Sequence, residues 1–246
     1  VTKKTKAIMV VHLAGYPCDM KEIWEIGLHF GIPVIEDAAH ALGAKYNSHY
    51  IGTLSDFCCF SFYATKHITT GDGGMITTAR TRYAQEIDKR RWYGIDRAKR
   101  FANPYLGYGD YDITELGFKY NMNDIAATIG IEQMKYVDWI MGRRMEIAKW
   151  YREELEGTKD LELFLWEINK VSGNWLFPIH VKRRLKFGEK MHEKGIECSI
   201  AYRRNDRYSI FGGFRKDLPN VDRLDKDMIY IPLHHDLTDE QIEYII

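Results

Sequence analysis

Short apolar stretches alternate with helical spacings over the first part of the chain. "KAIMVVHLAG", "PVIED" and "DFCCFSF" each predict a buried strand, the first of them almost at residue 1. Between the first two strands, residues 16–33 predict an amphipathic helix with Asp19 as N-cap and Gly31 as its stop. Because strands and helices alternate, the pattern predicts an α/β fold with a parallel sheet covered by helices.

The pattern becomes less regular further on. "GGMITTA" predicts another short strand, and residues 81–94 return to helical spacing. Residues 95–120 predict a long surface excursion whose aromatic side chains fit either a sugar site or packing against a partner subunit. Helical periodicity then runs from Asn123 to about Leu155, with Gly142 as the expected interruption.

The last part of the chain predicts a unit of its own. Strands are expected at "NWLFPIHV" and "DMIYIPL", one helix around "KFGEKMHEKG" and another that opens with the capping sequence "TDEQ". We therefore expect a large α/β domain with its connecting helix over residues 1–155, and a small α+β domain over residues 156–246.

Composition excludes several kinds of partner. The 246 residues include 35 Lys plus Arg and 35 Asp plus Glu, so the formal net charge is zero and nothing marks a nucleic-acid partner. Apolar runs are too short for a membrane span or a convincing signal peptide, so the expected location is cytoplasmic. The four cysteines have no metal-finger spacing, and adjacent His234, His235 and Asp236 cannot all point one way, so we expect no metal.

Asp37 and Lys66 are the residues with the clearest chemical potential. Each follows an apolar strand, and the carboxyl ends of parallel strands meet at one edge of a sheet, where ligands gather. Burial lowers the pKa of a lysine and makes its amine a better nucleophile. Such a pair suits pyridoxal phosphate (PLP), whose aldehyde bonds a lysine and whose ring nitrogen needs a carboxylate; Ser61 would suit the phosphate. Taken singly, Asp37 is more often a helix or turn cap, and Lys66 is more often a solvated loop lysine.

Longer motifs resemble one family. "VVHLAGYPCDM", "VIEDAAHALGAKYNSHYIGTLSDFCCFSFYATKHITTGDGGMITT" and "LGFKYNMNDIAATIGIEQM" resemble, in order, the pre-helix strand, cofactor region and interface segment of the DegT/StrS sugar aminotransferases. The resemblance covers essentially the whole chain. It implies a three-layer α/β/α large domain with a mostly parallel sheet and a small C-terminal α+β domain.

The resemblance also implies roles for individual residues. Lys66 would be the Schiff-base lysine and the general acid/base, and Asp37 the partner of the pyridine nitrogen. His40 falls where the family has Gln or His beside the cofactor, and Ser61 should bind the phosphate. Asn121 matches an asparagine that reaches the phosphate in a neighbouring subunit, which implies a homodimer with shared active sites.

A run at residues 202–205 is the candidate substrate contact. Tyr202, Arg203, Arg204 and Asn205 resemble a family run that begins with His instead of Tyr. Arginine suits oxyanions by its geometry, so these residues could bind a substrate diphosphate or the other subunit. A purely structural loop is the alternative.

The implied reaction transfers an amino group from glutamate to a nucleotide-linked keto sugar, in amino-sugar synthesis for a surface polysaccharide or glycoconjugate. Because Lys66 is present, the sequence does not resemble the dehydratase branch, which has histidine there. Family members carry a substantial segment ahead of the position where this chain begins, which supplies phosphate contacts and a ring-stacking aromatic residue. A noncatalytic dimerising or regulatory module is therefore the second hypothesis. A nicotinamide-binding domain is disfavoured because no GxGxxG follows a strand.

Overall fold

The computed structural model describes residues 1–99, 101–102, 105 and 109–246. The chain divides into two compact units, each assembled from separate segments. The first unit comprises Val1–His12, Cys18–Ala39 and His49–Tyr136. The second unit comprises Leu13–Pro17, His40–Ser48 and Val137–Ile246.

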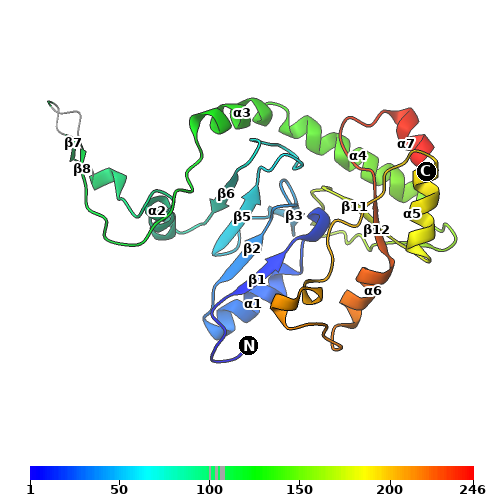
Figure 1. The fold of residues 1–246 in the computed structure, drawn as a ribbon, viewed down its shortest axis with the longest axis horizontal. Helices are drawn as coiled ribbons and strands as arrows, with labels where there is room; N and C mark the ends of the chain where they lie inside the picture. The colour runs from blue at the N-terminus through cyan, green and yellow to red at the C-terminus, as the bar shows by residue number, and fades with distance from the viewer. Residues whose placement is uncertain (100, 103–104, 106–108) are drawn as a thin grey trace. The chain divides into compact units, whose positions relative to one another are not determined.

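A four-stranded sheet forms the centre of the first unit (Figure 1). Its strands lie in the order β1 (Ile8–Val11), β2 (Val34–Asp37), β5 (Phe57–Ser61) and β6 (Gly74–Thr77). The pairs β1–β2 and β2–β5 are parallel, whereas β6 runs antiparallel to β5. The predicted α/β fold with a mostly parallel sheet is confirmed.

Helix α1 (Met20–Phe30) packs on one face of this sheet. A Cβ at Gly27 would lie 2.7 Å from Val34 Cγ2, so only glycine allows the helix this close to β2. Gly31 ends the helix as predicted, with a left-handed φ of 63°. Asp19 occupies the N-cap position, but its side chain makes no capping hydrogen bond.

The other elements of the first unit precede, lie within or follow the predicted surface excursion. They are β4 (His49–Tyr50), α2 (Thr81–Arg90), a 3₁₀ turn (Arg97–Lys99), β7 (Phe101–Ala102), β8 (Gly109–Asp110) and α3 (Asp124–Met134). The aromatic sequence "NPYLGYGDYDI" falls partly outside the described residues. Helix α3 starts where the sequence predicts, because the Asn123 side chain accepts a hydrogen bond from the Ala126 N–H at 2.9 Å.

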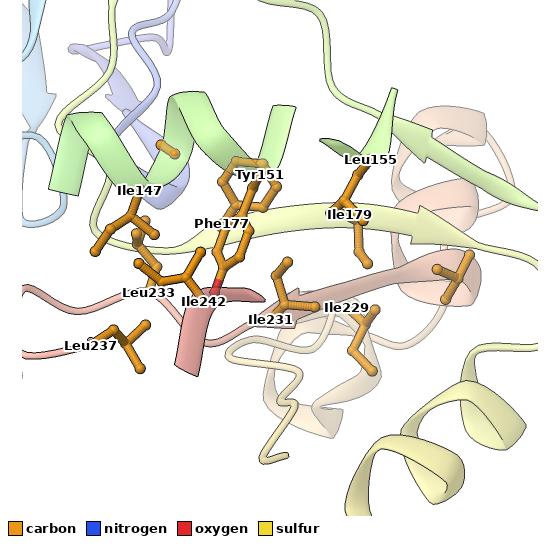
Figure 2. Close-up of a cluster of buried hydrophobic side chains, with 12 residues drawn as sticks. Ile147, Tyr151, Leu155, Phe177, Ile179, Ile229, Ile231, Leu233, Leu237 and Ile242 are labelled. Atoms are coloured by element: carbon orange, nitrogen blue, oxygen red, sulfur yellow. The ribbon is translucent and has the colours of Figure 1, made fainter. Parts of the chain in front are cut away.

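The second unit is built on a three-stranded antiparallel sheet in the order β12 (Met228–Ile231), β11 (Phe177–Val181) and β9 (Leu161–Leu163). Helices α4 (Val137–Leu155) and α7 (Asp239–Ile245) contribute side chains to the core on one face (Figure 2). This core contains fully buried Ile147, Tyr151, Ile179 and Ile242. The predicted cap of α7 is confirmed, since Thr238 and Gln241 form a capping box.

The remaining elements of the second unit are short. They are β3 (Lys45–Tyr46), which pairs with β10 (Lys170–Val171), the helices α5 (Arg184–Glu193) and α6 (Pro219–Asp227), and 3₁₀ turns at Leu13–Gly15, Asn205–Arg207 and Ser209–Phe211. No helix in the described part of the chain is long and apolar enough to cross a membrane.

The predicted interruption at Gly142 is wrong. The helical stretch breaks instead between Met134 and Val137, and Gly142 lies inside α4. At the break, the N–H groups of Lys135 and Tyr136 donate to carbonyls three residues back, which tightens and ends the last turn. A solvent-exposed glycine costs a helix only about 1 kcal/mol, so α4 continues through it.

Candidate active site

Asp37 lies at the carboxyl end of the parallel strands of the first unit. In the ladder it stands between Val11 of β1 and Cys59 of β5. Its carboxylate Oδ1 accepts a hydrogen bond from the Ala39 N–H at 3.1 Å, and its carbonyl accepts one from the His12 N–H at the same distance. The half-buried side chain is thus held at the edge where ligands of parallel sheets bind.

Three polar or nucleophilic side chains share the face of the sheet to which Asp37 belongs. Asp37 and Cys59 are direct neighbours across the β2–β5 ladder, and Ser61 follows Cys59 by two residues on the same strand. Because side chains alternate between faces along a strand, all three point to the same side. The sheet therefore brings together Asp37 and Ser61, as the sequence predicts.

Lys66 follows β5 in a loop that is closed at its base by backbone hydrogen bonds. The Phe62 N–H donates to the Gly73 carbonyl at 2.8 Å, and the Thr70 N–H donates to the Phe62 carbonyl at 3.0 Å. Within the loop, the Lys66 N–H donates to the Tyr63 carbonyl at 3.0 Å, which fixes a turn at the lysine. These hydrogen bonds define the path of the loop that carries the Lys66 side chain.

The charge state of Lys66 is set by two opposing influences. Partial burial, the larger influence, lowers the pKa of its amine, while the negative charge of Asp37 raises it. The net pKa lies below the ordinary value for lysine. The same Asp37 charge adds to burial in raising the pKa of the Cys59 thiol. Lys66, Asp37 and Cys59 thus share one electrostatic environment, and at a given pH more of the Lys66 amine is in the neutral, nucleophilic form than in an ordinary lysine.

Ser61 and Asn121 are the two predicted phosphate ligands of the first unit. The Ser61 Oγ accepts a hydrogen bond from the Tyr63 N–H at 3.2 Å, and its own O–H is the donor that an anion requires. The Asn121 Nδ2 donates to the Met122 carbonyl at 3.3 Å. Its Oδ1 is buried and has no hydrogen-bond partner within the described residues. Because this oxygen only accepts hydrogen bonds, Asn121 could contact a phosphate only through its Nδ2.

His40 and Tyr202 meet within the second unit. The His40 Nε2 lies 3.0 Å from the Tyr202 hydroxyl, although the two residues are 162 positions apart. On its other side the His40 ring stacks on Trp175, with ring centroids 3.9 Å apart. The predicted cofactor neighbour and the first residue of the predicted substrate run are therefore linked directly.

The other residues of that run differ in what their side chains can do. Arg204 is buried, and its guanidinium donates to both oxygens of Asp206, to Asp222 and to the Arg215 carbonyl. These bonds favour the structural alternative for Arg204. Arg203 and Asn205 are exposed, so their side chains remain candidates for a diphosphate.

Sequence reasoning missed three residues that touch or support these side chains. They are Trp175, His12 and Glu36, of which the last two form a buried pair. The sequence does carry a signal for this pair. His12 directly follows one apolar strand and Glu36 lies inside the next, and both are polar residues at positions where apolar core residues are expected. Nothing in the sequence marks Trp175 as a neighbour of His40.

The fold, an α/β sheet with a lysine loop and an aspartate at its carboxyl edge, is that of the PLP-dependent sugar aminotransferases. The model of the DegT/DnrJ/EryC1/StrS aminotransferase family matches residues 1–246, and the chain belongs to this family. The crystal structure of the sugar aminotransferase CalS13 from Micromonospora echinospora superposes with a TM-score of 0.92 at 31% identity, over 100% of this chain and 67% of that one.

Two curated relatives extend the comparison. The protein MJ1066 of Methanocaldococcus jannaschii is 41% identical over 98% of this chain and 65% of its own length. The UDP-4-amino-4-deoxy-L-arabinose–oxoglutarate aminotransferase of Shewanella sediminis is 32% identical over 100% of this chain and 67% of its own length. The chain spans about two thirds of the length of the curated relatives it matches.

The family is PLP-dependent, and the residues of the first unit fit this cofactor. The fit rests on a half-buried carboxylate at the strand end and an amine whose pKa burial lowers. A hydroxyl on the carboxylate's own face of the sheet is placed to donate to a phosphate. This set provides one group for each reactive part of PLP: the aldehyde, the ring nitrogen and the phosphate.

Proposed function

We propose that the protein transfers an amino group from an amino donor to a keto sugar carried on a nucleotide, with PLP as cofactor. The observation that carries the proposal is the placement of Lys66, which has a lowered pKa, within the field of Asp37 at the carboxyl edge of the sheet. Bound PLP supplies a protonated ring that accepts the electron pair left when a substrate C–H bond is broken.

The residues of the chain perform the other tasks. The Lys66 amine would hold the cofactor through its aldehyde and, once displaced by the substrate amine, would take a proton from the substrate carbon and deliver it to the former aldehyde carbon of the cofactor. The Asp37 carboxylate would hold the proton on the pyridine nitrogen, and the Ser61 hydroxyl would donate to the phosphate. The Nδ2 of Asn121 would be a second donor to a phosphate, which we propose to be the one bound by a partner subunit.

We assign the remaining predicted residues by the same reasoning. His40, oriented by Tyr202 and Trp175, would contact the cofactor ring or its phenolic oxygen. Arg203 and Asn205 would contact the diphosphate of the substrate, for which exposed donors are suited. Arg204 would hold the segment that carries them, through its bonds to Asp206 and Arg215.

Glutamate is the proposed amino donor. The name of the Shewanella relative pairs a nucleotide sugar with oxoglutarate, the keto acid that glutamate becomes when it gives up its amino group. The proposed product is an amino sugar on its nucleotide carrier, for a surface polysaccharide or glycoconjugate. The proposed location is the cytoplasm.

Visible absorbance provides the first test. Purified protein mixed with PLP should acquire an absorbance band that vanishes in Lys66→Ala and persists in Lys21→Ala, a control at an exposed lysine of α1. A panel of nucleotide-linked keto sugars with glutamate, followed by mass spectrometry, should then identify the acceptor. Lys66→Ala should reduce that turnover by at least about a hundredfold, because both the covalent bond and the base are lost.

The same experiment decides between the enzyme and the noncatalytic module. A folded protein that gains no band with PLP, or a Lys66→Ala variant that keeps the band, would contradict the enzyme hypothesis. The module hypothesis instead expects dimerisation without cofactor binding.

A further inference from the structure

A fully buried histidine–carboxylate pair lies next to Asp37. His12 is 0% exposed and Glu36 is 1% exposed, and the His12 Nε2 lies 2.8 Å from the Glu36 Oε2. The other ring nitrogen, Nδ1, accepts a hydrogen bond from the Cys18 N–H at 3.1 Å. Because Nδ1 faces a donor, the ring proton lies on Nε2 and is donated to Glu36.

His12 also holds the strand through its backbone. Its N–H donates to the Asp37 carbonyl at 3.1 Å, one residue beyond the last pair of the β1–β2 ladder, Val11 with Asp37. The side chain of His12 therefore binds Glu36 while its main chain binds Asp37. Together these bonds fix both residues that flank the last peptide of β2.

The pair acts from the side of the sheet away from the proposed cofactor. Glu36 pairs with Cys58 and shares a face with Val34, against which α1 packs at Gly27. Asp37 belongs to the opposite face. His12 and Glu36 therefore cannot touch the cofactor that Asp37 faces, and any effect they have on it must pass through the strand.

Stability alone is a poor reason for this pair. The second oxygen of Glu36, Oε1, is buried and has no hydrogen-bond partner within the described part of the chain. A buried pair that contains a charged group usually repays little more than the cost of removing it from water, and apolar side chains of similar size often replace such a pair without loss. The pair is better explained by the position that it enforces.

We propose that His12, through Glu36, is a positioning residue that holds the end of β2 so that the Asp37 carboxylate is fixed for the pyridine nitrogen of PLP. The inference rests on the proposed function. A displacement of about 1 Å at a reacting group can lower the rate by up to about a hundredfold. The loss of the hydrogen bonds that His12 makes at the end of β2 should therefore have a measurable effect.

Three variants test the tie in the presence of PLP. His12→Leu removes both ring bonds, His12→Gln retains a donor for Glu36, and His29→Gln changes an exposed histidine of α1 as the control. His12→Leu should weaken PLP binding by about tenfold and shift the pH midpoint of the absorbance band. His12→Gln should restore most of both, and His29→Gln should match the unchanged protein.

A second readout needs no cofactor. Burial and the Asp37 charge both raise the pKa of the Cys59 thiol. A loosened strand end admits water and moves the charge, so the pH midpoint for alkylation of Cys59 should fall in His12→Leu and recover in His12→Gln. Tandem mass spectrometry locates the label. If the unchanged protein fails to bind PLP, the proposed function fails, but this readout still decides whether His12 positions Asp37.

A double variant guards against simple unfolding. His12→Leu leaves Glu36 buried without its donor, whereas His12→Leu with Glu36→Leu removes both polar groups and should fold, as circular dichroism would show. The folded double variant should still show the lowered Cys59 midpoint and the weaker PLP binding. Unchanged values for both in a folded double variant would overturn the proposal.

Discussion

The amine of Lys66 is adjusted by the same carboxylate that would serve the cofactor. Burial favours the neutral amine, and Asp37 partly restores the charged form. The balance matters because only the neutral amine is nucleophilic, and an ordinary lysine is almost wholly protonated at neutral pH. The charge of Asp37, in turn, attracts the protonated amine and keeps it nearby. The reactivity of Lys66 therefore depends on the charge of Asp37.

This coupling gives a prediction with a definite sign. In Asp37→Asn the influence that raises the pKa of Lys66 is removed and burial remains, so the pKa should fall further. At a given pH, a larger share of the Lys66 amine is then neutral in the variant than in the unchanged protein, so Lys66 should be acylated faster. Competitive acylation of the protein without cofactor, followed by peptide mass spectrometry as a function of pH, measures the rate at Lys66.

Exposed Lys21 serves as the internal control for this measurement, since its labelling rate should not change. A Lys66 rate that stays constant or drops in Asp37→Asn would show that the carboxylate does not act on the amine. The same variant should bind PLP more weakly even though its lysine is more reactive, because the ring nitrogen loses its partner.

At the scale of elements, the larger hydrophobic core of the second unit is built from side chains of α4, α7, β11 and β12. Strand β11 is central, because Ile179 pairs with Ile229 on one side and Leu163 on the other. Figure 2 shows Ile179 beneath Leu155 of α4 and alongside the side chains of β12. Truncation of Ile179 would leave a cavity that the hydrogen-bonded strands on either side cannot easily fill by moving inward.

Truncation of Ile179 tests this directly. Ile179→Ala should lower the free energy of unfolding of the second unit by about 2–5 kcal/mol, from lost burial and the cavity left behind. Leu185→Ala, at a 77% exposed position of α5, should change it by less than about 0.5 kcal/mol. Urea unfolding followed by circular dichroism gives both values, and equal effects would contradict the assigned core.

Elements were predictable where one periodicity dominated. The strands at Ile8–Val11 and Val34–Asp37 and the capped helix after Thr238 follow from short apolar runs and local capping residues. The position of the break between α3 and α4 was not predictable from Gly142. The low helix propensity of one exposed glycine has a small effect compared with the hydrogen bonds that close the turn at Lys135.

At the scale of the whole molecule, α3 is apolar around most of its surface but scarcely buried. Only Ala126 is buried in it, whereas Ile125, Ile131 and Met134 are 78%, 65% and 56% exposed. A helix that is apolar on all sides is normally enclosed by protein. This exposure supports the proposed homodimer, in which α3 would contact a second copy of the chain.

Light scattering during size-exclusion chromatography tests the dimer. Ile131→Asp should weaken self-association by about tenfold or more, since an unpaired carboxylate would be buried. Leu165→Asp, at an 84% exposed position of the second unit, is the matched control and should leave the dimer intact. A monomeric unchanged protein, or an Ile131→Asp protein that remains dimeric, would contradict the role of α3.

The site was predictable in part, and the reason is topological. Asp37, Ser61 and Lys66 lie near parallel strand ends, whose convergence at one edge follows from the strand pattern itself. The bond from His12 to Glu36 depends on the register of two strands whose residues are 24 positions apart. The stacking of Trp175 on His40 depends on the course of loops, which periodicity does not report.

One peptide bond in β2 separates two acids that point to opposite sides of the sheet. Slippage of the strand by a single step would turn each acid to the other side of the sheet, so that the Glu36 side chain, one methylene longer, would take the place of Asp37 and an isoleucine would take the place of Glu36. The imidazole of His12 would then lose its carboxylate, and the coenzyme would face a carboxylate of the wrong length. Register therefore decides which acid serves which partner, and acidity alone does not define this strand.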